Sequence, residues 1–335
     1  MKKYSFITIF SLVFLLLSAC SSGKTGASSS SDQDEASNGE VEKILVTEAF
    51  HSLLYLPLYV GNQVGIFEGN GLEISSIRAA GTGPTALTSV LSGESQFSVH
   101  GPEHVGFAKE KGGHAKIISA VANSAPVWVL AKEDVTVNSP ADLKGKRIVV
   151  GLAPGTSHTL LTRLLQDNGL DPKKDVTITE VQLGSELGPV LAGEADIAVA
   201  YQPQADQGIA QGLKIVHDFT KDYPDYAFST FNTSQKLIEE NPEMVGKFVK
   251  SMDQSLAFIH ENPEKAKEIA QKEFPELDAD VVGKAVERMI GSNVYPESAK
   301  VSEEAFHAAF DMQKFVGNLK NDIKYDDIVS SEFAN

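Results

Sequence analysis

One nine-residue pattern occurs twice in this chain, 100 residues apart. It runs from Leu91 to Val99 and again from Leu191 to Val199, and both copies read Leu, a small residue, Gly, Glu, a small residue, any residue, an apolar residue, a small residue and Val. The glycine is typical of a helix end, and the apolar residues after it are typical of a buried strand. Such junctions are common in α/β proteins, but a repeat of this length and spacing favours two lobes of one design.

Strand-like and helix-like segments alternate through most of the chain. Short apolar or alternating runs predict strands, and the segments between them have helical patterns, for example from Pro84 to Leu91. The strand-like runs are 43–47, 72–77, 96–99, 146–150 and 197–200. Alternation of this kind predicts an α/β fold with mostly parallel sheets. After residue 235 only helix starts follow, at Asn241, Asn262, Asp278, Asp280 and Ser302, so we expect late helices around one lobe and the linking region.

The chain therefore divides into two lobes joined by a hinge. Lobe 1 is expected to take residues 41–130 together with 231–335, and lobe 2 to take 131–230. The linking segments are expected near Val129–Lys132 and Phe228–Phe231.

The N-terminus has the pattern of an export signal. Two lysines precede an apolar run from Phe6 to Leu17, which is too short to span a bilayer but fits the apolar core of a secretory signal. The run ends Leu-Ser-Ala-Cys at Cys20, which resembles the lipobox of bacterial lipoproteins. The alternative is an ordinary signal peptide with a chance cysteine. We predict a signal peptide over 1–19, a lipid on Cys20, a polar tether over 20–40, and an extracytoplasmic protein anchored to the bacterial cell membrane.

Charge and cysteine content exclude several classes of function. The formal net charge is −16, so the chain lacks the basic excess of a general nucleic-acid binder or of a protein docked on anionic lipid. Cys20 is the single cysteine, which excludes internal disulfides, cysteine zinc sites and iron–sulfur clusters.

Five segments, in order, resemble the SsuA/TauA/NMT1-like solute-binding proteins. They are Leu58–Ile74, Gly81–Leu87, Val99–Glu103, Ser139–Lys146 and Asn168–Asp175, within a match over roughly residues 43–260. The resemblance implies a two-lobed, type II periplasmic-binding-protein fold. It also implies a receptor that delivers a small solute to the permease subunits of an ABC importer, with no cofactor. Relatives handle alkanesulfonates, taurine, nitrate or bicarbonate, and pyrimidine precursors of thiamine.

The candidate pocket follows from a general rule about open sheets. Ligands bind at the carboxyl ends of parallel strands, close to helix N-termini. That rule, with the linking strand at Trp128, selects the following residues: His51, Ser52, Thr82, Gly83, His100, Gly101, Glu103, Trp128, Gly155, Thr156, Ser157, His158, Tyr201 and Gln202.

Hydroxyls beside two helix starts predict an anion site. Thr156 and Ser157 follow Gly155, and Thr82 precedes Gly83, so each loop offers O–H and N–H donors, although each is also what an ordinary helix cap requires. Glu103 either interacts favourably with the dipole of the helix that it begins or holds an ammonium group of the ligand.

The histidines at strand ends allow more than one interpretation. His51, His100 and His158 are candidate donors to an anion or a heterocycle, or surface residues. His100 and His104 have the i, i+4 spacing of metal ligands, but no acidic residue accompanies them at metalloprotease spacing, so we predict no metal centre.

Aromatic residues complete the predicted pocket. Tyr201 follows a strand directly and is a candidate wall, whereas Trp128 is either wall or core. Gln202 stands where relatives often have an acidic residue, which disfavours a cationic ligand group there. We predict a monomeric receptor for a small organic anion such as a sulfonate, taurine or nitrate-like solute. A thiamine-precursor pyrimidine is the alternative ligand, and a metal-binding receptor is the alternative class. No GxSxG elbow and no cysteine-rich motif of the pyrimidine synthases is present, so we predict no enzyme.

Overall fold

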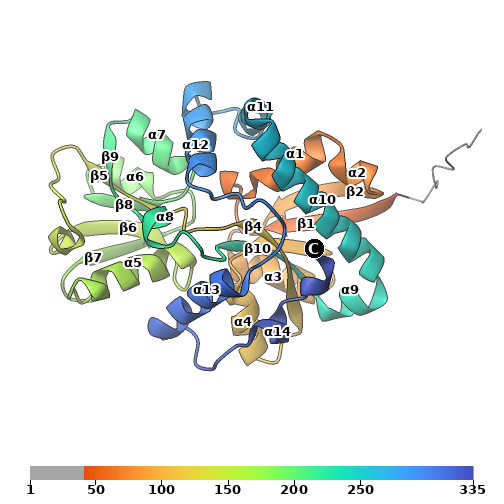
Figure 1. The fold of residues 1–335 in the computed structure, drawn as a ribbon. Coiled ribbons are helices and arrows are strands. Elements are labelled where there is room, and N and C mark those ends of the chain that lie inside the picture. The colour runs from red at the N-terminus through yellow and green to blue at the C-terminus, as the bar shows by residue number, and fades with distance from the viewer. Residues whose placement is uncertain (1–40, 335) are drawn as a thin grey trace, which may run out of the picture. The chain divides into compact units, whose positions relative to one another are not determined.

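The first of two five-stranded sheets contains strands from both ends of the described chain. The computed structural model describes residues 41–334 (Figure 1). The strand order is β2-β1-β3-β10-β4, in which β1 pairs in parallel with β2 and β3 while β10 runs antiparallel to β3 and β4. The strands are β1 (Glu42–Glu48), β2 (Leu72–Ala79), β3 (Phe97–His100), β4 (Ala115–Ala122) and β10 (Ser229–Ser234).

The second sheet repeats this plan. Its order is β7-β6-β8-β5-β9, with β6 parallel to β7 and β8, and β5 antiparallel to β8 and β9. The strands are β5 (Trp128–Lys132), β6 (Arg147–Gly151), β7 (Thr177–Val181), β8 (Ile197–Ala200) and β9 (Leu213–Asp218). The prediction of two lobes with mostly parallel sheets is confirmed. In each sheet four of the five strands run the same way, and the strand that the chain enters from the other lobe runs opposite to them.

The chain crosses between the sheets twice. Residues 123–127 lead from β4 into β5, and residues 219–228 lead from β9 into β10. The lobe boundaries expected at 130 and 231 therefore fall within β5 and β10, a few residues after each crossing.

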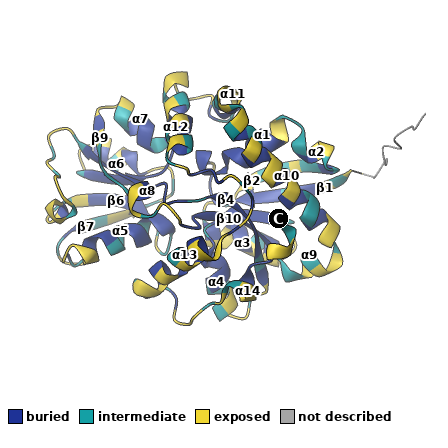
Figure 2. Cartoon of the chain, in the orientation of Figure 1, coloured by how far each residue is buried: buried dark blue, intermediate teal, exposed yellow. Residues whose placement is uncertain are grey.

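Helices cover the sheets. Each helix exposes its outer face to solvent, while the strands are largely buried (Figure 2). The first lobe carries α1 (Leu56–Gln63), α2 (Ile66–Gly69), α3 (Gly83–Leu91) and α4 (Glu103–Glu110). The second carries α5 (Thr156–Asp167), α6 (Leu187–Leu191), α7 (Gln204–Ala210) and α8 (Phe219–Asp222). No helix within residues 41–334 is both long and apolar enough to cross a membrane.

The late helices are α9 (Gln235–Glu240), α10 (Pro242–Glu261), α11 (Pro263–Glu273), α12 (Ala279–Gly291), α13 (Glu303–Phe315) and α14 (Tyr325–Ile328). Four of them begin after the predicted caps Asn241, Asn262, Asp278 and Ser302, whereas Asp280 lies within α12 and the starts of α9 and α14 were not predicted. Asn241 caps α10 by accepting from the N–H of Met244 at 3.0 Å, and Ser302 caps α13. These helices reach further than expected, because α12 contacts α7 and α13 contacts α5 in the second lobe.

The two copies of the nine-residue pattern, 91–99 and 191–199, have the same local structure. Gly93 and Gly193 follow the ends of α3 and α6 with φ of +79° and +81°. Three residues later, the side chains of Gln96 and Asp196 accept a backbone N–H from β1 and β6, at 2.8 and 2.9 Å. Each copy therefore ends a helix and aligns the next strand in the same way.

Alanine at either junction glycine should destabilise the protein. A residue with a Cβ is strained in the left-handed region, so Gly93→Ala and Gly193→Ala should each lower the free energy of unfolding by about 1–2 kcal/mol, measured by urea denaturation. Gly188 lies within α6 with open space around it, so Gly188→Ala is the control and should be neutral or stabilising. Equal stability of all three variants would contradict this account.

Candidate functional site

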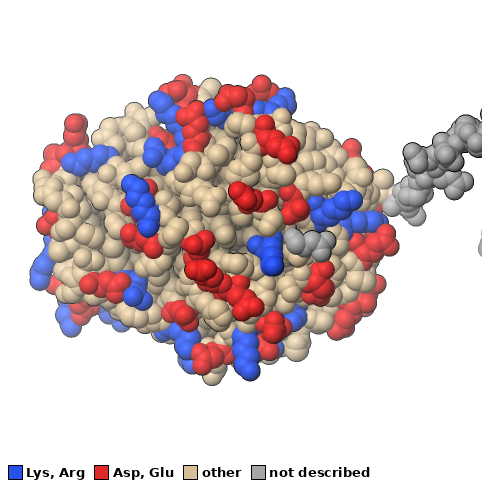
Figure 3. Space-filling view, in the orientation of Figure 1, with Lys and Arg blue, Asp and Glu red and all other residues tan. Residues whose placement is uncertain are grey.

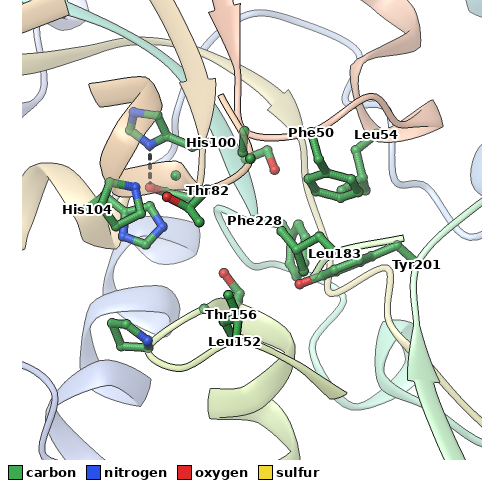
Figure 4. A pocket seen from close by; sticks show the side chains of 18 of the residues that line it. Phe50, Leu54, Thr82, His100, His104, Leu152, Thr156, Leu183, Tyr201 and Phe228 are labelled. Carbon is green, nitrogen blue, oxygen red and sulfur yellow. Dashed lines mark hydrogen bonds between the residues drawn. The ribbon is translucent and has the colours of Figure 1, made fainter. Parts of the chain in front are cut away.

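Loops from both lobes enclose a cavity of about 280 Å³ (Figure 4). It lies at the carboxyl ends of the parallel strands, where the general rule for open sheets places ligands. Its lining residues are Ala49, Phe50, Leu54, Tyr55, Gly81, Thr82, Gly83, Pro84, His100, Gly101, His104, Leu152, Ala153, Pro154, Gly155, Thr156, Leu183, Tyr201, Phe228 and Ser229.

Half of the predicted site residues line this cavity and half do not. Those that line it are Thr82, Gly83, His100, Gly101, Gly155, Thr156 and Tyr201. Those outside the lining are His51, Ser52, Glu103, Trp128, Ser157, His158 and Gln202. Contact of any of them with a solute stays a prediction.

Two helix starts face the cavity from different lobes. Thr82 caps α3 by accepting the N–H of Thr85 at 3.3 Å, and its loop forms one wall. Gly155 precedes α5 without a side-chain cap, and Thr156 is the first residue of that helix. Backbone N–H groups and the positive dipole ends of both helices therefore meet at one cavity.

Thr156 also joins the lobes through Glu103. Its hydroxyl donates to Glu103 Oε1 at 2.7 Å, from the second lobe to the first residue of α4. Among the described residues the nearest basic group to this carboxyl is His104, with Nε2 at 3.9 Å. Burial raises the pKa of Glu103 to about 7, although the hydrogen bond from Thr156 opposes the shift.

A second set of bonds joins the lobes behind the cavity. Ser52 Oγ donates to the backbone carbonyl of Gln202 at 2.9 Å, and Gln202 Nε2 donates to Asp206 at 2.6 Å. Arg288 of α12 holds the same buried Asp206 with two hydrogen bonds, at 2.8 and 2.9 Å. Ser52 and Gln202 are thus connectors between the lobes rather than cavity walls.

The two histidines that line the cavity are neutral near pH 7. Burial lowers the pKa of His100 to about 3, and the neighbouring His104 adds to this effect. Burial lowers the pKa of His104 to about 4. His100 is further fixed by Ser98, whose Oγ lies 3.0 Å from its Nε2. These rings act as neutral hydrogen-bonding groups, not as cations.

The other two predicted histidines lie elsewhere. Burial works to lower the pKa of His51, but the carboxylate of Glu48 at 3.1 Å and the contact with Glu273 outweigh it, so the pKa is raised. Burial lowers the pKa of His158, which approaches Glu180 at 3.7 Å. No group of three or more metal-ligating side chains occurs among residues 41–334, so His100 and His104 lack the further ligands that a metal centre needs.

Trp128 and Ser157 belong to the core beneath the cavity. Both are fully buried, and neither the indole N–H of Trp128 nor the hydroxyl of Ser157 has a partner in the described chain. The backbone N–H of Ser157 donates to the hydroxyl of Tyr201 at 3.1 Å, which fixes the Tyr201 ring against the cavity. Thr156, not Ser157, therefore presents its side chain toward the space.

Sequence reasoning missed the apolar wall of the cavity. The ring of Phe50 lies 5.6 Å from that of Tyr201 and 6.0 Å from that of Tyr55, and Phe228 stands 5.7 Å from Tyr201 on another side. Phe50 directly precedes a residue that was selected, but an apolar side chain at a strand end carries no signal that separates a wall from the core. Among the lining residues described here there is no lysine or arginine, so the polar groups of the wall are neutral.

Comparisons with known proteins agree with this architecture. A family model described as NMT1/THI5 like matches residues 54–266. The chain is 24% identical to the putative binding protein YtlA of Bacillus subtilis (87% of this chain, 89% of that one) and 26% identical to the riboflavin-binding protein RibY of Chloroflexus aurantiacus (82% and 80%). The solved alkanesulfonate-binding protein SsuA of Xanthomonas axonopodis pv. citri, bound to MOPS, superposes with a TM-score of 0.72 at 16% identity (87% and 99%). This likeness confirms the type II binding-protein fold.

Stability should depend on the proton of Glu103. Below about pH 4.5 the carboxyl is protonated in folded and unfolded chains alike. Between about 4.5 and 7 only the folded chain keeps this proton, so Glu103 contributes a fall of about 3 kcal/mol in the free energy of unfolding as pH rises through this window, whereas His100 and His104, whose pKa values are lowered, contribute a rise. Glu103→Gln retains an oxygen that can accept from Thr156, and it removes the contribution of Glu103 to the slope of the free energy of unfolding against pH. Urea denaturation of the wild type and the variant at several pH values would measure the difference.

Two comparisons make this measurement decisive. Burial also raises the pKa of Glu186 to about 7, so Glu186→Gln should remove a contribution of the same sign and similar size, and the two changes should add in the double variant. The exposed Glu133 supplies a control, because Glu133→Gln should leave the slope unchanged. A wild-type slope in Glu103→Gln would disprove the assignment.

Proposed function

This chain belongs to the NMT1/THI5-like family, and we propose that it is the solute-binding receptor of an ABC importer that holds a small organic anion between its lobes. The observation that carries the proposal is the cavity that strand-end loops of both lobes bound together. A site shared in this way is completed only when the lobes approach one another, so solute binding and lobe closure are one event. The crossings at 123–127 and 219–228 are the segments about which the lobes would move.

The choice of an anion rests on the helix starts of α3 and α5. N–H groups at the two helix starts supply donors from both lobes without any fixed cation, and the hydroxyl of Thr82 lies beside one of them. The rings of Phe50, Tyr55 and Phe228 offer an apolar surface to the organic part of the solute. A sulfonate or taurine-like solute combines both features, and the alkanesulfonate-binding relative supports that class; a nitrate-like anion would use the donors alone.

A flat heterocycle is the alternative ligand. The tilted rings of Phe50 and Tyr201, beside the neutral imidazole of His100, form the kind of wall on which a pyrimidine stacks. The riboflavin-binding relative also handles a flat heterocyclic ring system. An uncharged pyrimidine would not depend on the ionisation of Glu103, which gives a direct means of discrimination.

The remaining assignments follow from the receptor role. The protein would act outside the cytoplasm as a monomer, without cofactor or catalytic activity, and would present its solute to the permease subunits. On the face shown in Figure 3, lysine and arginine side chains are interspersed with aspartate and glutamate, and they form no basic stripe for nucleic acid. The proposed signal peptide (1–19), the lipid on Cys20 and the tether (20–40) lie outside the described residues.

Affinity for an anion should fall as pH rises through neutrality. Glu103 itself does not line the cavity, but its neighbour His104 and its hydrogen-bond partner Thr156 do, so a bound sulfonate, which stays ionised, would repel the carboxylate and favour its protonated form. With a pKa of about 7, the affinity for hexanesulfonate should fall roughly tenfold between pH 6 and pH 8, measured by calorimetry.

Two glutamine variants and a neutral ligand control this experiment. Glu103→Gln should bind hexanesulfonate equally well at both pH values. Glu133→Gln should keep the wild-type dependence, because Glu133 is exposed and lies outside the cavity wall. Tight binding of an uncharged pyrimidine without pH dependence, and no sulfonate binding at either pH, would replace the anion by the heterocycle.

Membrane attachment should depend on one atom, the sulfur of Cys20. In cells fed labelled fatty acid, the wild-type chain should incorporate label and sediment with membranes, because two acyl chains on one residue are enough for stable anchoring. Cys20→Ala should lose both properties, whereas Ser21→Ala should keep them. Sedimentation of Cys20→Ala with membranes would argue against the lipid anchor.

A further inference from the structure

The cavity has two ends that differ in chemistry. Thr82 and Thr156, beside the helix starts, lie on the left and at the bottom of the close-up, whereas Phe50, Phe228 and Tyr201 gather toward its right (Figure 4). The N–H groups of the helix starts suit an anion at the first end. The second end has no such donors, so it must bind a different part of the solute.

Four aromatic rings surround the second end, which we call the aromatic end: Phe50, Tyr55, Tyr201 and Phe228. The planes of Phe50 and Tyr55 meet at 69°, those of Phe50 and Tyr201 at 39°, and those of Tyr201 and Phe228 at 68°. The rings therefore form a concave wall rather than a stack. All four residues are buried, so packing holds the rings in place before a solute arrives.

The charge near the aromatic end is negative. No lysine or arginine is among the described residues that line the cavity. Glu186, three residues after the lining residue Leu183, is fully buried, and neither of its carboxyl oxygens has a partner within residues 41–334. Burial raises the pKa of Tyr201 and the charge of Glu186 adds to this shift, so the carboxyl acts electrostatically on one ring of the wall. A cation at the aromatic end would supply the positive charge that this carboxyl lacks.

A primary ammonium group does not suit this end. Such a group needs acceptors for three N–H donors, and no aspartate or glutamate is among the residues that line the cavity. The hydroxyl oxygen of Tyr201 already accepts the N–H of Ser157 at 3.1 Å. A fully alkylated ammonium group has no N–H to satisfy, and its charge is attracted to the faces of aromatic rings.

We propose that the aromatic end of the cavity holds a quaternary ammonium group of the solute. This inference rests on the proposed function, because an anionic group of the same molecule lies at the helix starts of α3 and α5. It deepens that function by naming the substrate class, a zwitterion with a fully alkylated nitrogen. At about 30 Å³ for each water molecule the cavity has room for about nine, close to the number of non-hydrogen atoms in a trimethylammonium group joined by two carbons to a sulfonate.

Two sulfonates of equal shape test the role of the positive charge. One is the trimethylated derivative of taurine, and the other is its analogue in which a carbon atom replaces the nitrogen. By calorimetry, the trimethylated compound should bind at least roughly tenfold more tightly, because the neutral analogue is not attracted to the ring faces. Taurine itself, with its primary ammonium group, should bind more weakly than its trimethylated derivative. Equal or tighter binding of the neutral analogue, or tighter binding of taurine, would overturn the inference.

A leucine substitution tests the role of the rings. Leucine keeps an apolar side chain but has no aromatic face, so Phe50→Leu should reduce the affinity ratio of the charged to the neutral sulfonate by roughly threefold or more. Phe258 is a half-buried phenylalanine of α10 outside the cavity lining, so Phe258→Leu is the matched control and should keep the wild-type ratio. A urea denaturation curve for each variant checks that it is folded. The wild-type ratio in folded Phe50→Leu, or the same reduction in both variants, would contradict the inference.

Tetramethylammonium chloride, compared with sodium chloride in a thermal-shift assay, separates the failure of the inference from that of the proposed function. If both sulfonates bind equally and tetramethylammonium does not stabilise the protein, the receptor for small anions stands and the ammonium site is wrong. If no sulfonate binds, but tetramethylammonium stabilises the wild type and not Phe50→Leu, the anion is wrong and the ammonium site stands. If neither kind of ion binds, both are wrong.

Discussion

The two crossings of the chain, each of which leads into an interior strand of the next sheet, hold the two lobes together. In each sheet the fourth strand, β10 or β5, arrives from the other lobe and is hydrogen-bonded along both edges. Removing such a strand would leave two rows of backbone groups unpaired, so each crossing leads into a strand that is firmly held within its sheet. What remains free is rotation about the two crossings. The cavity therefore lies beside the segments that permit motion, and the surrounding loops stay anchored to rigid sheets.

Electrostatics restrict what this cavity can hold. Glu103 and Glu186 are buried without a lysine or arginine partner among the described residues, and two neutral histidines, His100 and His104, line the wall. A site of this kind cannot hold an anion by opposite charge. It must use oriented N–H and O–H groups, which demand a defined geometry, and it must keep the carboxyl of Glu103 protonated. Selectivity then depends on shape and on proton concentration together.

The helices and strands could be predicted from the sequence more fully than the residues that line the cavity. Caps such as Asn241 and the glycines of the repeat act locally, so their consequences are visible in a few residues. The strand-end rule likewise found most of the right loops. It could not decide which side chain of each loop turns inward, because neighbours point in different directions: Phe50 lines the cavity while His51 contacts Glu48, and Tyr201 lines it while Gln202 faces Asp206. The prediction selected polar residues of these loops, whereas their apolar neighbours form much of the cavity wall.

The bonds that run from Ser52 through Gln202 and Asp206 to Arg288 have a consequence for evolution of the receptor. They connect the lobes outside the cavity, so their contribution to the arrangement of the lobes described here is the same for every solute. Measured affinity is the intrinsic affinity of the closed form multiplied by the fraction of molecules that adopt it. Substitutions in this set would thus retune sensitivity to scarce or abundant nutrients while leaving the ranking of those nutrients intact. Natural selection can therefore change the overall affinity through these residues and the preference among solutes through the residues of the cavity.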